Sequence, residues 1–175
     1  MKKEKNKPVF LWVYLIGMAI LVFFDQITKI VAENNLYNKN AFVIIEGVFE
    51  FSYLRNAGAA WGMLSGKRIL FLLITAFMLG VITYVVIKMP VTKKMLPLEC
   101  VCILLGAGAV GNFIDRLMFG YVRDFIYFKA INFPVFNVAD SYVTIALVMF
   151  VILVFFIYEE EDFDFLKISD RKKSK

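Results

Sequence analysis

The stretch VADSYVTIALVMFVILVFFIY occupies residues 138–158 and decides the class of fold. An α-helix rises about 1.5 Å per residue, so a run of this length crosses the roughly 30 Å hydrocarbon core of a bilayer. Its one carboxylate, Asp140, stands near the start of the run. We therefore expect residues 138–158 to form a membrane span that carries an acidic side chain at one end.

Three further apolar runs of similar length precede this one, at about residues 9–32, 69–87 and 95–117. The chain is 61% hydrophobic with a mean hydropathy of +0.72, which is typical of an integral membrane protein and not of a soluble domain. Its 175 residues leave room for four spans and short loops. We predict an all-α integral membrane fold with four transmembrane helices, in a single domain over residues 1–175.

The placement of basic residues predicts how the chain is oriented across the membrane. Twelve of the twenty Lys and Arg lie in the N-terminal tail, in residues 88–94 and in the C-terminal tail. Such residues remain preferentially on the cytoplasmic side, so we expect both termini to be cytoplasmic. A net charge of +5 raises the possibility of a nucleic-acid partner, but this placement better fits topology and anionic phospholipid. We expect contact with membrane phospholipid and no nucleic acid.

With that topology, unusual polar residues from separate segments of the chain reach the same depth. They are Asp25 near the outer end of the first span, Asn56 in the first outer loop, Asn112, Asp115 and Arg116 at the end of the third span, Asp124 in the second outer loop, and Asn137 and Asp140 at the start of the fourth. Carboxylates near lipid are costly, and their presence favours a functional role. The sequence therefore predicts a site at the outer face of the membrane.

The outer loops have a pattern of their own. Residues 41–45 and 48–53, separated by Glu46-Gly47, are typical of a β-hairpin, and residues 121–128 could add a strand. Residues 57–64 are rich in small side chains and contain Trp61, which suggests a short interfacial helix. We expect this small extracytoplasmic β-hairpin and short-helix element to cover the site.

Each of these acidic residues also has a purely structural interpretation. Asp124 could be a solvated loop carboxylate, and Asp140 could cap the fourth helix. Asp25 and Lys29 are four apart and could form a plain ion pair near the interface. Asp115 is best explained as a structural partner, because its neighbour Arg116 faces another side of the helix.

The small residues and cysteines of the third span have structural interpretations. Gly106, Gly108 and Gly111 form a surface suited to close helix packing. Cys100 and Cys102 are expected to be buried thiols, not a disulfide or a metal pair. The chain contains no histidine, so the usual nucleophile–base pairs are missing and carboxylate acid chemistry remains.

Five short motifs, in order along the chain, resemble the bacterial lipoprotein signal peptidases (signal peptidase II). They are FDQITK at 24–29, RNAGAAWG at 55–62, GAVGNFIDR at 108–116, VRDF at 122–125 and FNVADS at 136–141. The resemblance implies that Asp124 and Asp140 are the catalytic pair. It also implies supporting or substrate-binding roles for Asp25, Asn56, Asn112, Arg116 and Asn137.

The same resemblance implies an intramembrane-type aspartic endopeptidase. Its substrate would be a prolipoprotein whose cysteine carries diacylglycerol, and cleavage would fall just before that cysteine. Two close carboxylates share a proton, so one activates a water and the other hydrogen-bonds the scissile carbonyl. This chemistry needs no metal and no cofactor. We expect a monomer in the bacterial cytoplasmic membrane.

Two positions depart from the family pattern. Ala57 stands where Asn is frequent, and Arg123 stands where an apolar residue usually precedes the first catalytic aspartate. Arg123 could point at the dyad and lower the pKa of Asp124. Because successive side chains of an extended segment face opposite ways, we instead expect Arg123 to point away, towards lipid headgroups.

Two other classes of function remain as alternatives. An ion-coupled transporter would more often place its carboxylates near the midplane, on broken helices. A metal-dependent lipid-headgroup transferase would use Asp115, Asp124 and Asp140 to hold Mg²⁺, although such sites take closely spaced aspartates from one helix. Cleavage that survives a chelator separates this second class from the dyad.

Overall fold

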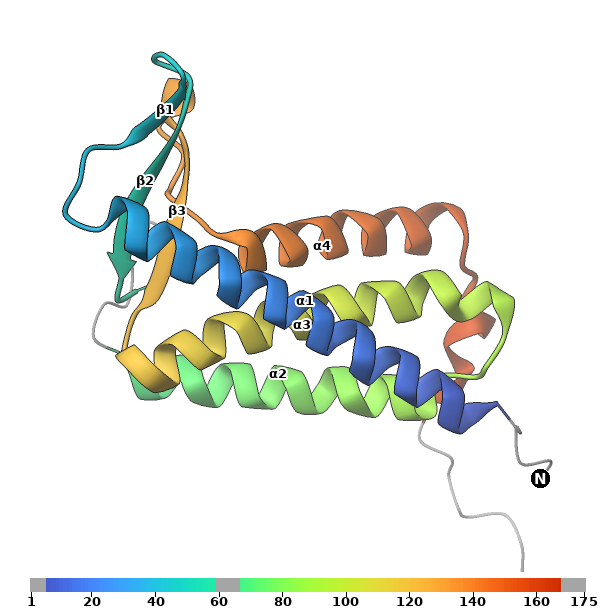
Figure 1. Ribbon diagram of the computed structural model, residues 1–175. Helices are drawn as coiled ribbons and strands as arrows, with labels where there is room; N and C mark the ends of the chain where they lie inside the picture. Colours follow the sequence, from blue (N-terminus) through green and yellow to red (C-terminus); the bar gives the residue numbers. More distant parts are fainter. Residues whose placement is uncertain (1–5, 59–66, 168–175) are drawn as a thin grey trace, which may run out of the picture.

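Four long helices run alongside one another, and a small antiparallel sheet lies at one end of the bundle (Figure 1). The structure is a computed structural model that describes residues 6–58 and 67–167. The elements in chain order are α1 (Lys7–Leu36), β1 (Phe42–Ile45), β2 (Phe49–Asn56), α2 (Arg68–Lys88), η2 (Lys93–Met95), α3 (Leu96–Phe119), β3 (Val122–Phe128), η3 (Lys129–Ile131), α4 (Val138–Phe156) and η4 (Glu160–Leu166), where η marks a short 3₁₀ helix.

The four predicted spans are confirmed. In the described part of the chain, four helices are long and apolar enough to cross a membrane, and they correspond to α1, α2, η2 with α3, and α4. Large apolar side chains lie exposed on the outside of the bundle, among them Trp12, Phe77 and Phe155 at 62%, 70% and 76% exposure. A bilayer would cover such a surface, so the chain is a multi-pass membrane protein.

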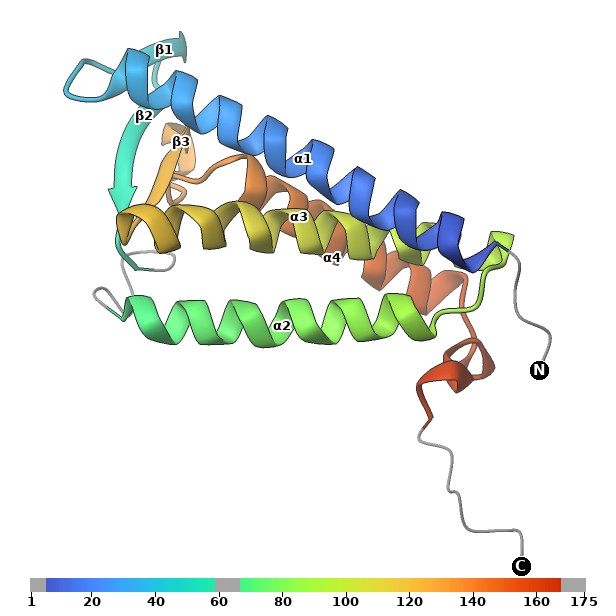
Figure 2. The same cartoon turned by 60° about the horizontal axis from the view of Figure 1, so that its bottom comes forward.

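Helix α3 is the centre of the bundle and packs against each of the other three helices. Figure 2 shows it running between α1 and α2. The approach is close where α3 lacks side chains. A Cβ added at Gly108 would lie 2.6 Å from the carbonyl oxygen of Ala139, and one at Gly111 would lie 2.5 Å from Oδ2 of Asp25. The predicted small-residue packing surface is therefore confirmed, and it brings α1 and α4 onto α3.

The sheet has the order β1-β2-β3 and is antiparallel throughout. The predicted hairpin is present, with Gly47 at φ 72° in its turn, and β3 is the additional strand expected at 121–128. Beyond β3, Phe136 exchanges backbone hydrogen bonds with Ile126. The predicted short helix at 57–64 falls largely on residues 59–66, which lie outside the described residues.

The sheet and the start of α4 lie at one end of the bundle, and the start of α1 lies at the other (Figure 1).

The expectation of two buried thiols is wrong for Cys100, which is exposed, whereas Cys102 is buried. Residues two apart on a helix point to different sides, so only one of the two cysteines faces the core of the helix bundle.

Candidate active site

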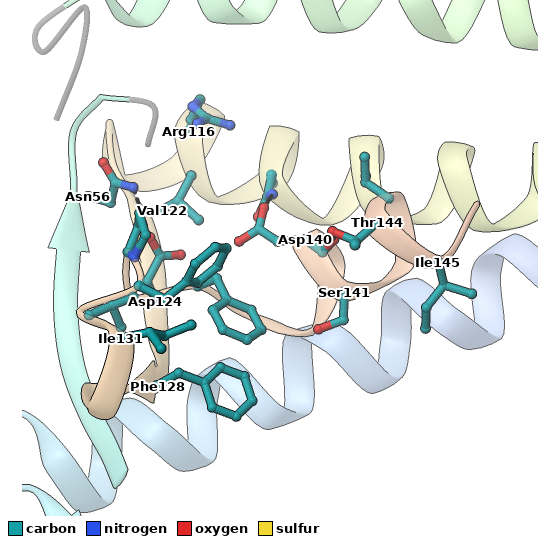
Figure 3. Close-up of a pocket in the computed structure, with 16 residues that line it drawn as sticks. Asn56, Arg116, Val122, Asp124, Phe128, Ile131, Asp140, Ser141, Thr144 and Ile145 are labelled. Atoms are coloured by element: carbon teal, nitrogen blue, oxygen red, sulfur yellow. Dashed lines mark hydrogen bonds between the residues drawn. The ribbon is translucent and has the colours of Figure 1, made fainter. Parts of the chain in front are cut away.

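A cavity of about 820 Å³ opens where β2, β3, α3 and α4 meet (Figure 3). Five of the seven predicted site residues line it, namely Asn56, Asn112, Arg116, Asp124 and Asp140. The other two, Asp25 and Asn137, are fully buried behind these residues. Most of the remaining wall is apolar and is formed by Val122, Phe128, Ile131, Phe133, Pro134, Val135, Phe136, Val143 and Ile145.

The local sequence explains why these elements meet. Helix α3 ends at Phe119 and is capped by Gly120, whose φ of 82° places it in the left-handed region that favours glycine, and β3 begins at Val122. The chain thus reverses beside the end of α3. The backbone hydrogen bonds of Phe136 to β3 then bring Asn137, at the start of α4, next to Asp124.

Asp124 is buried on β3, with 2% of its surface exposed. Its Oδ1 accepts a hydrogen bond from the side-chain amide of Asn137 at 2.7 Å, and its Oδ2 accepts one from Asn56 at 2.8 Å. Burial and, less strongly, the nearby carboxylate of Asp140 raise the pKa of Asp124 to about 7, although the two amide donors favour the ionised form and oppose this shift. The interpretation as a solvated loop carboxylate is wrong.

Asp140 belongs to the first turn of α4 and faces the cavity (Figure 3). Its Oδ2 accepts from the backbone N–H of Asn137 at 3.0 Å, while its own N–H donates to Oδ1 of Asn137 at 3.1 Å. This reciprocal pair is a capping box. Its Oδ1 accepts from the side-chain amide of Asn112 at 2.7 Å. Asp140 therefore completes the helix cap and also lines the cavity.

A buried lysine fixes the orientation of Asn112. Oδ1 of Asn112 accepts from Nζ of Lys29 at 2.9 Å and from Nδ2 of Asn137 at 3.1 Å. Because both donors meet its oxygen, the amide nitrogen of Asn112 is the atom that reaches Asp140. Sequence reasoning missed this role of Lys29. A lysine inside an apolar span must find polar partners, and that rule was the available signal.

Asp25 joins α1 to the start of α4. Its Oδ1 accepts from the backbone N–H of Ala139 at 2.9 Å, and its Oδ2 lies 3.0 Å from Nζ of Lys29. The side chains of Asp25 and Lys29 are fully buried. The expected ion pair exists, and it lies in the interior of the protein beside Asp115, whose Oδ2 is 3.6 Å from Nζ of Lys29.

Arg116 lines the cavity next to Asn56 (Figure 3). Its Nη2 donates to the carbonyl oxygen of Gly58 at 3.2 Å, and its guanidinium lies 4.6 Å from the centre of the Phe71 ring. These contacts connect α3 to the segment after β2 and to α2, and they hold a cation at the cavity that the two aspartates also line.

Arg123 does not reach lipid headgroups, so that expectation is wrong. Its side chain is 4% exposed and forms an ion pair with Asp115 at 2.8 Å. Arg123 and Asp124 contact different partners, as strand alternation predicts. The carboxylate of Asp115 draws the guanidinium inward, and this also confirms Asp115 as a structural partner.

The geometry gives no support to the Mg²⁺ site considered above. Among residues 6–58 and 67–167, no three His, Cys, Asp or Glu side chains lie together as a metal site requires. Asp115 is engaged by Arg123 and Lys29, whereas Asp124 and Asp140 accept hydrogen bonds from asparagine amides.

Comparison with known proteins gives a consistent family. A family model described as signal peptidase (SPase) II matches residues 17–156. The lipoprotein signal peptidase of Enterococcus faecalis (strain ATCC 700802 / V583) is 38% identical over 149 residues, which cover 85% of this chain and 90% of that protein. The lipoprotein signal peptidase of Staphylococcus aureus (strain JH9) is 40% identical over 146 residues, 79% of this chain and 88% of that protein.

Two solved structures, both described as bacterial membrane enzymes, share the fold. One has a TM-score of 0.71 at 34% identity, and the match covers 95% of this chain and 94% of the chain in that structure. The other has a TM-score of 0.73 at 35% identity, and the match covers 85% of this chain and 96% of the chain in that structure.

Proposed function

Since the chain belongs to the signal peptidase II family, we propose that Asp124 and Asp140 are the catalytic dyad of an aspartic endopeptidase. The observation that carries the proposal is the pair itself. Two carboxylates from different elements face one cavity, and the pKa of the buried Asp124 is raised to about 7 by burial and by Asp140. Such a pair holds one proton near neutral pH, which is what acid–base hydrolysis of a peptide requires.

The surroundings of each aspartate suggest which one carries the proton. Asp140 lies in the first turn of α4 and accepts a backbone N–H, where the helix dipole favours a negative charge. Asp124 has the raised pKa. We therefore assign the proton at rest to Asp124 and the negative charge to Asp140.

The reaction then follows from these two states. Asp140 takes a proton from a water molecule, and the oxygen of that water attacks the scissile carbonyl carbon. Asp124 donates a hydrogen bond to the carbonyl oxygen and so stabilises the tetrahedral intermediate. As the C–N bond breaks, a proton passes to the departing amine, and the dyad again holds one proton. Every step uses only the carboxylates, water and the peptide.

The supporting residues act on this pair. Asn112 and Asn137 orient the carboxylates through their amides, and Asn56 holds Asp124 from the opposite side. Asp25 fixes the first turn of α4 through the N–H of Ala139. Arg116 is a fixed cation at the cavity and is suited to orienting backbone carbonyls of a substrate.

The cavity wall suggests the substrate. Its apolar side chains, on β3, on α4 and on the segment that joins them, can contact acyl chains, while the polar end holds the two aspartates. We assign the substrate as a prolipoprotein whose cysteine carries diacylglycerol, with cleavage just before that cysteine. The enzyme would act as a monomer at the outer face of the bacterial cytoplasmic membrane, with both termini in the cytoplasm.

The test is cleavage by the purified protein in detergent or lipid. A diacylglyceryl-modified prolipoprotein should lose its signal peptide, and the same precursor without the lipid should be cleaved far more slowly. Addition of a chelator should leave the rate unchanged. Equal cleavage of both precursors would overturn the substrate assignment, and loss of activity with chelator would overturn the metal-free dyad.

A further inference from the structure

We propose that Arg123 is a positioning residue, which fixes β3 against α1 and α3 and thereby fixes Asp124 in the cavity. This inference rests on the proposed function, because it explains how the residue next to a catalytic aspartate is held.

The first contact is with α3. The backbone N–H of Arg123 donates to Oδ2 of Asp115 at 2.9 Å, Nε donates to the same oxygen at 3.2 Å, and Nη2 donates to Oδ1 at 2.8 Å. A guanidinium paired with a carboxylate through two nitrogens has a fixed geometry, which a lysine cannot reproduce. One carboxylate thus holds both the side chain and the backbone of the residue that precedes Asp124.

The second contact is with α1. Nη2 of Arg123 also donates to Oε1 of Gln26 at 2.9 Å, and Nη1 lies 3.4 Å from Oε2 of Glu33. The guanidinium lies 4.8 Å from the centre of the Phe119 ring. Arg123 therefore joins β3 to two helices, on the side of the strand away from the partners of Asp124.

Arg123 also balances the buried charges that orient Asn112. Lys29 lies 3.0 Å from Asp25 and 3.6 Å from Asp115, and its Nζ donates to Asn112. With Arg123 present, two cations face these two buried aspartates. Without it, Lys29 alone would face both carboxylates, and a buried unpaired charge is strongly unfavourable. The ammonium would then be drawn towards Asp115 and away from Asn112, whose amide reaches Asp140.

The sheet provides a matched control. Arg55 on β2 is paired in register with Arg123 and lies 3.5 Å from Glu33. Its side chain is 41% exposed, whereas that of Arg123 is 4% exposed. Removal of the positive charge at Arg55 therefore tests loss of a neighbouring arginine without loss of the contact to Asp115.

The experiment compares kcat and KM for Arg123→Gln, Arg123→Lys and Arg55→Gln, each normalised to folded, monodisperse enzyme. A displacement of a reacting group by about 1 Å costs about 10²-fold in rate. We expect Arg123→Gln to lower kcat by roughly 10- to 100-fold with KM within about twofold, and Arg123→Lys to recover part of the loss. Arg55→Gln should stay within about twofold of the parent in both constants.

A double substitution tests the charge balance. In Arg123→Gln/Asp115→Asn the unpaired carboxylate is also removed, so kcat should be no lower than in Arg123→Gln alone. A folded Arg123→Gln enzyme with the parental kcat would overturn the inference. If Arg123→Gln does not fold, the lysine variant decides, and a folded Arg123→Lys enzyme with the parental kcat would overturn the inference. Failure of the proposed function gives a different result, since Asp124→Asn would then retain turnover.

Discussion

Asn137 donates a hydrogen bond of 2.7 Å from its side-chain amide to Oδ1 of Asp124, although one residue caps a membrane helix and the other lies on a strand. The same residue donates its backbone N–H to Oδ2 of Asp140. A single asparagine thus contacts both aspartates, and its side chain takes part both in the cap of α4 and in holding Asp124.

These two roles of Asn137 can be separated. Serine is also a good N-cap, but it lacks the amide that reaches Asp124. We expect Asn137→Ser to lower kcat at least about tenfold with little change in stability. We expect Asn137→Ala to lower kcat by a similar factor and also to lower the free energy of unfolding by about 1 kcal/mol. Turnover and thermal unfolding of both variants check this. Parental turnover in Asn137→Ser would show that the amide has no part in the reaction.

Asp124→Asn and Asp140→Asn should each abolish cleavage while the protein stays folded. Asparagine keeps the shape of the side chain but neither takes up nor releases a proton near neutral pH. General acid–base contributions of this kind are worth about 10²–10⁴-fold in rate, so we expect a loss of roughly 10³-fold or more. Turnover within tenfold of the parent in either variant would show that the dyad assignment is wrong.

The pH dependence follows from the raised pKa of Asp124, which burial and Asp140 bring to about 7. A raised carboxyl pKa favours the neutral form, so Asp124 carries its proton below about pH 7 and loses it above. Because the proposed reaction needs that proton, kcat/KM should fall as the pH rises through about 7. A profile that stays flat to about pH 9 would contradict the assignment of the proton to Asp124.

A substitution of Asn56 tests whether Asp124 causes this fall in kcat/KM, the basic limb of the pH–rate profile. Its amide donates to Asp124 and opposes the upward shift of the pKa. Asn56→Ala should therefore raise the pKa of Asp124 and move the basic limb of the profile to higher pH. A limb that moves to lower pH in this variant would show that another group controls it.

The sequence predicted the spans, the strands and the gathering of polar residues around one cavity better than it predicted the charge network behind that cavity. A run of about twenty apolar residues has few structural outcomes, and the polar residues of four segments could be assigned to one depth from topology alone. Lys29 and Arg123 were misjudged because their partners lie on other elements, and even Asp115, eight residues from Arg123, is reached only across the turn between α3 and β3. Asn112 lies 83 residues from Lys29, and Glu33 lies 90 residues from Arg123. Within this charge network, the four-residue spacing of Asp25 and Lys29 was the one feature of the sequence that predicted an ion pair.

Orientation in the membrane can be tested with single cysteines in a background without Cys100 and Cys102. Asn38 follows α1 at the sheet end, and Glu160 follows α4 at the opposite end. We expect an impermeant thiol reagent to label Asn38→Cys in intact cells and to label Glu160→Cys only after lysis. The reverse pattern would place the cavity on the cytoplasmic side.

The close approach of α1 and α4 to α3 gives a last prediction. A Cβ added at Gly111 would lie 2.5 Å from Oδ2 of Asp25 and 3.1 Å from Cβ of Ala139, so one of these elements must move. Asp25 holds the first turn of α4 through Ala139, and Asp140 is in that turn.

We therefore expect Gly111→Ala to lower kcat at least about tenfold, because small displacements of a reacting group are costly, and to lower thermal stability. Gly80→Ala on α2 is the matched control, since an added Cβ there meets nothing within 4 Å. It should keep parental turnover and equal or slightly higher stability, as alanine favours helix by up to about 1 kcal/mol over glycine. If both alanine variants behave like the parent, Asp25 does not control the position of Asp140, and its burial serves packing alone.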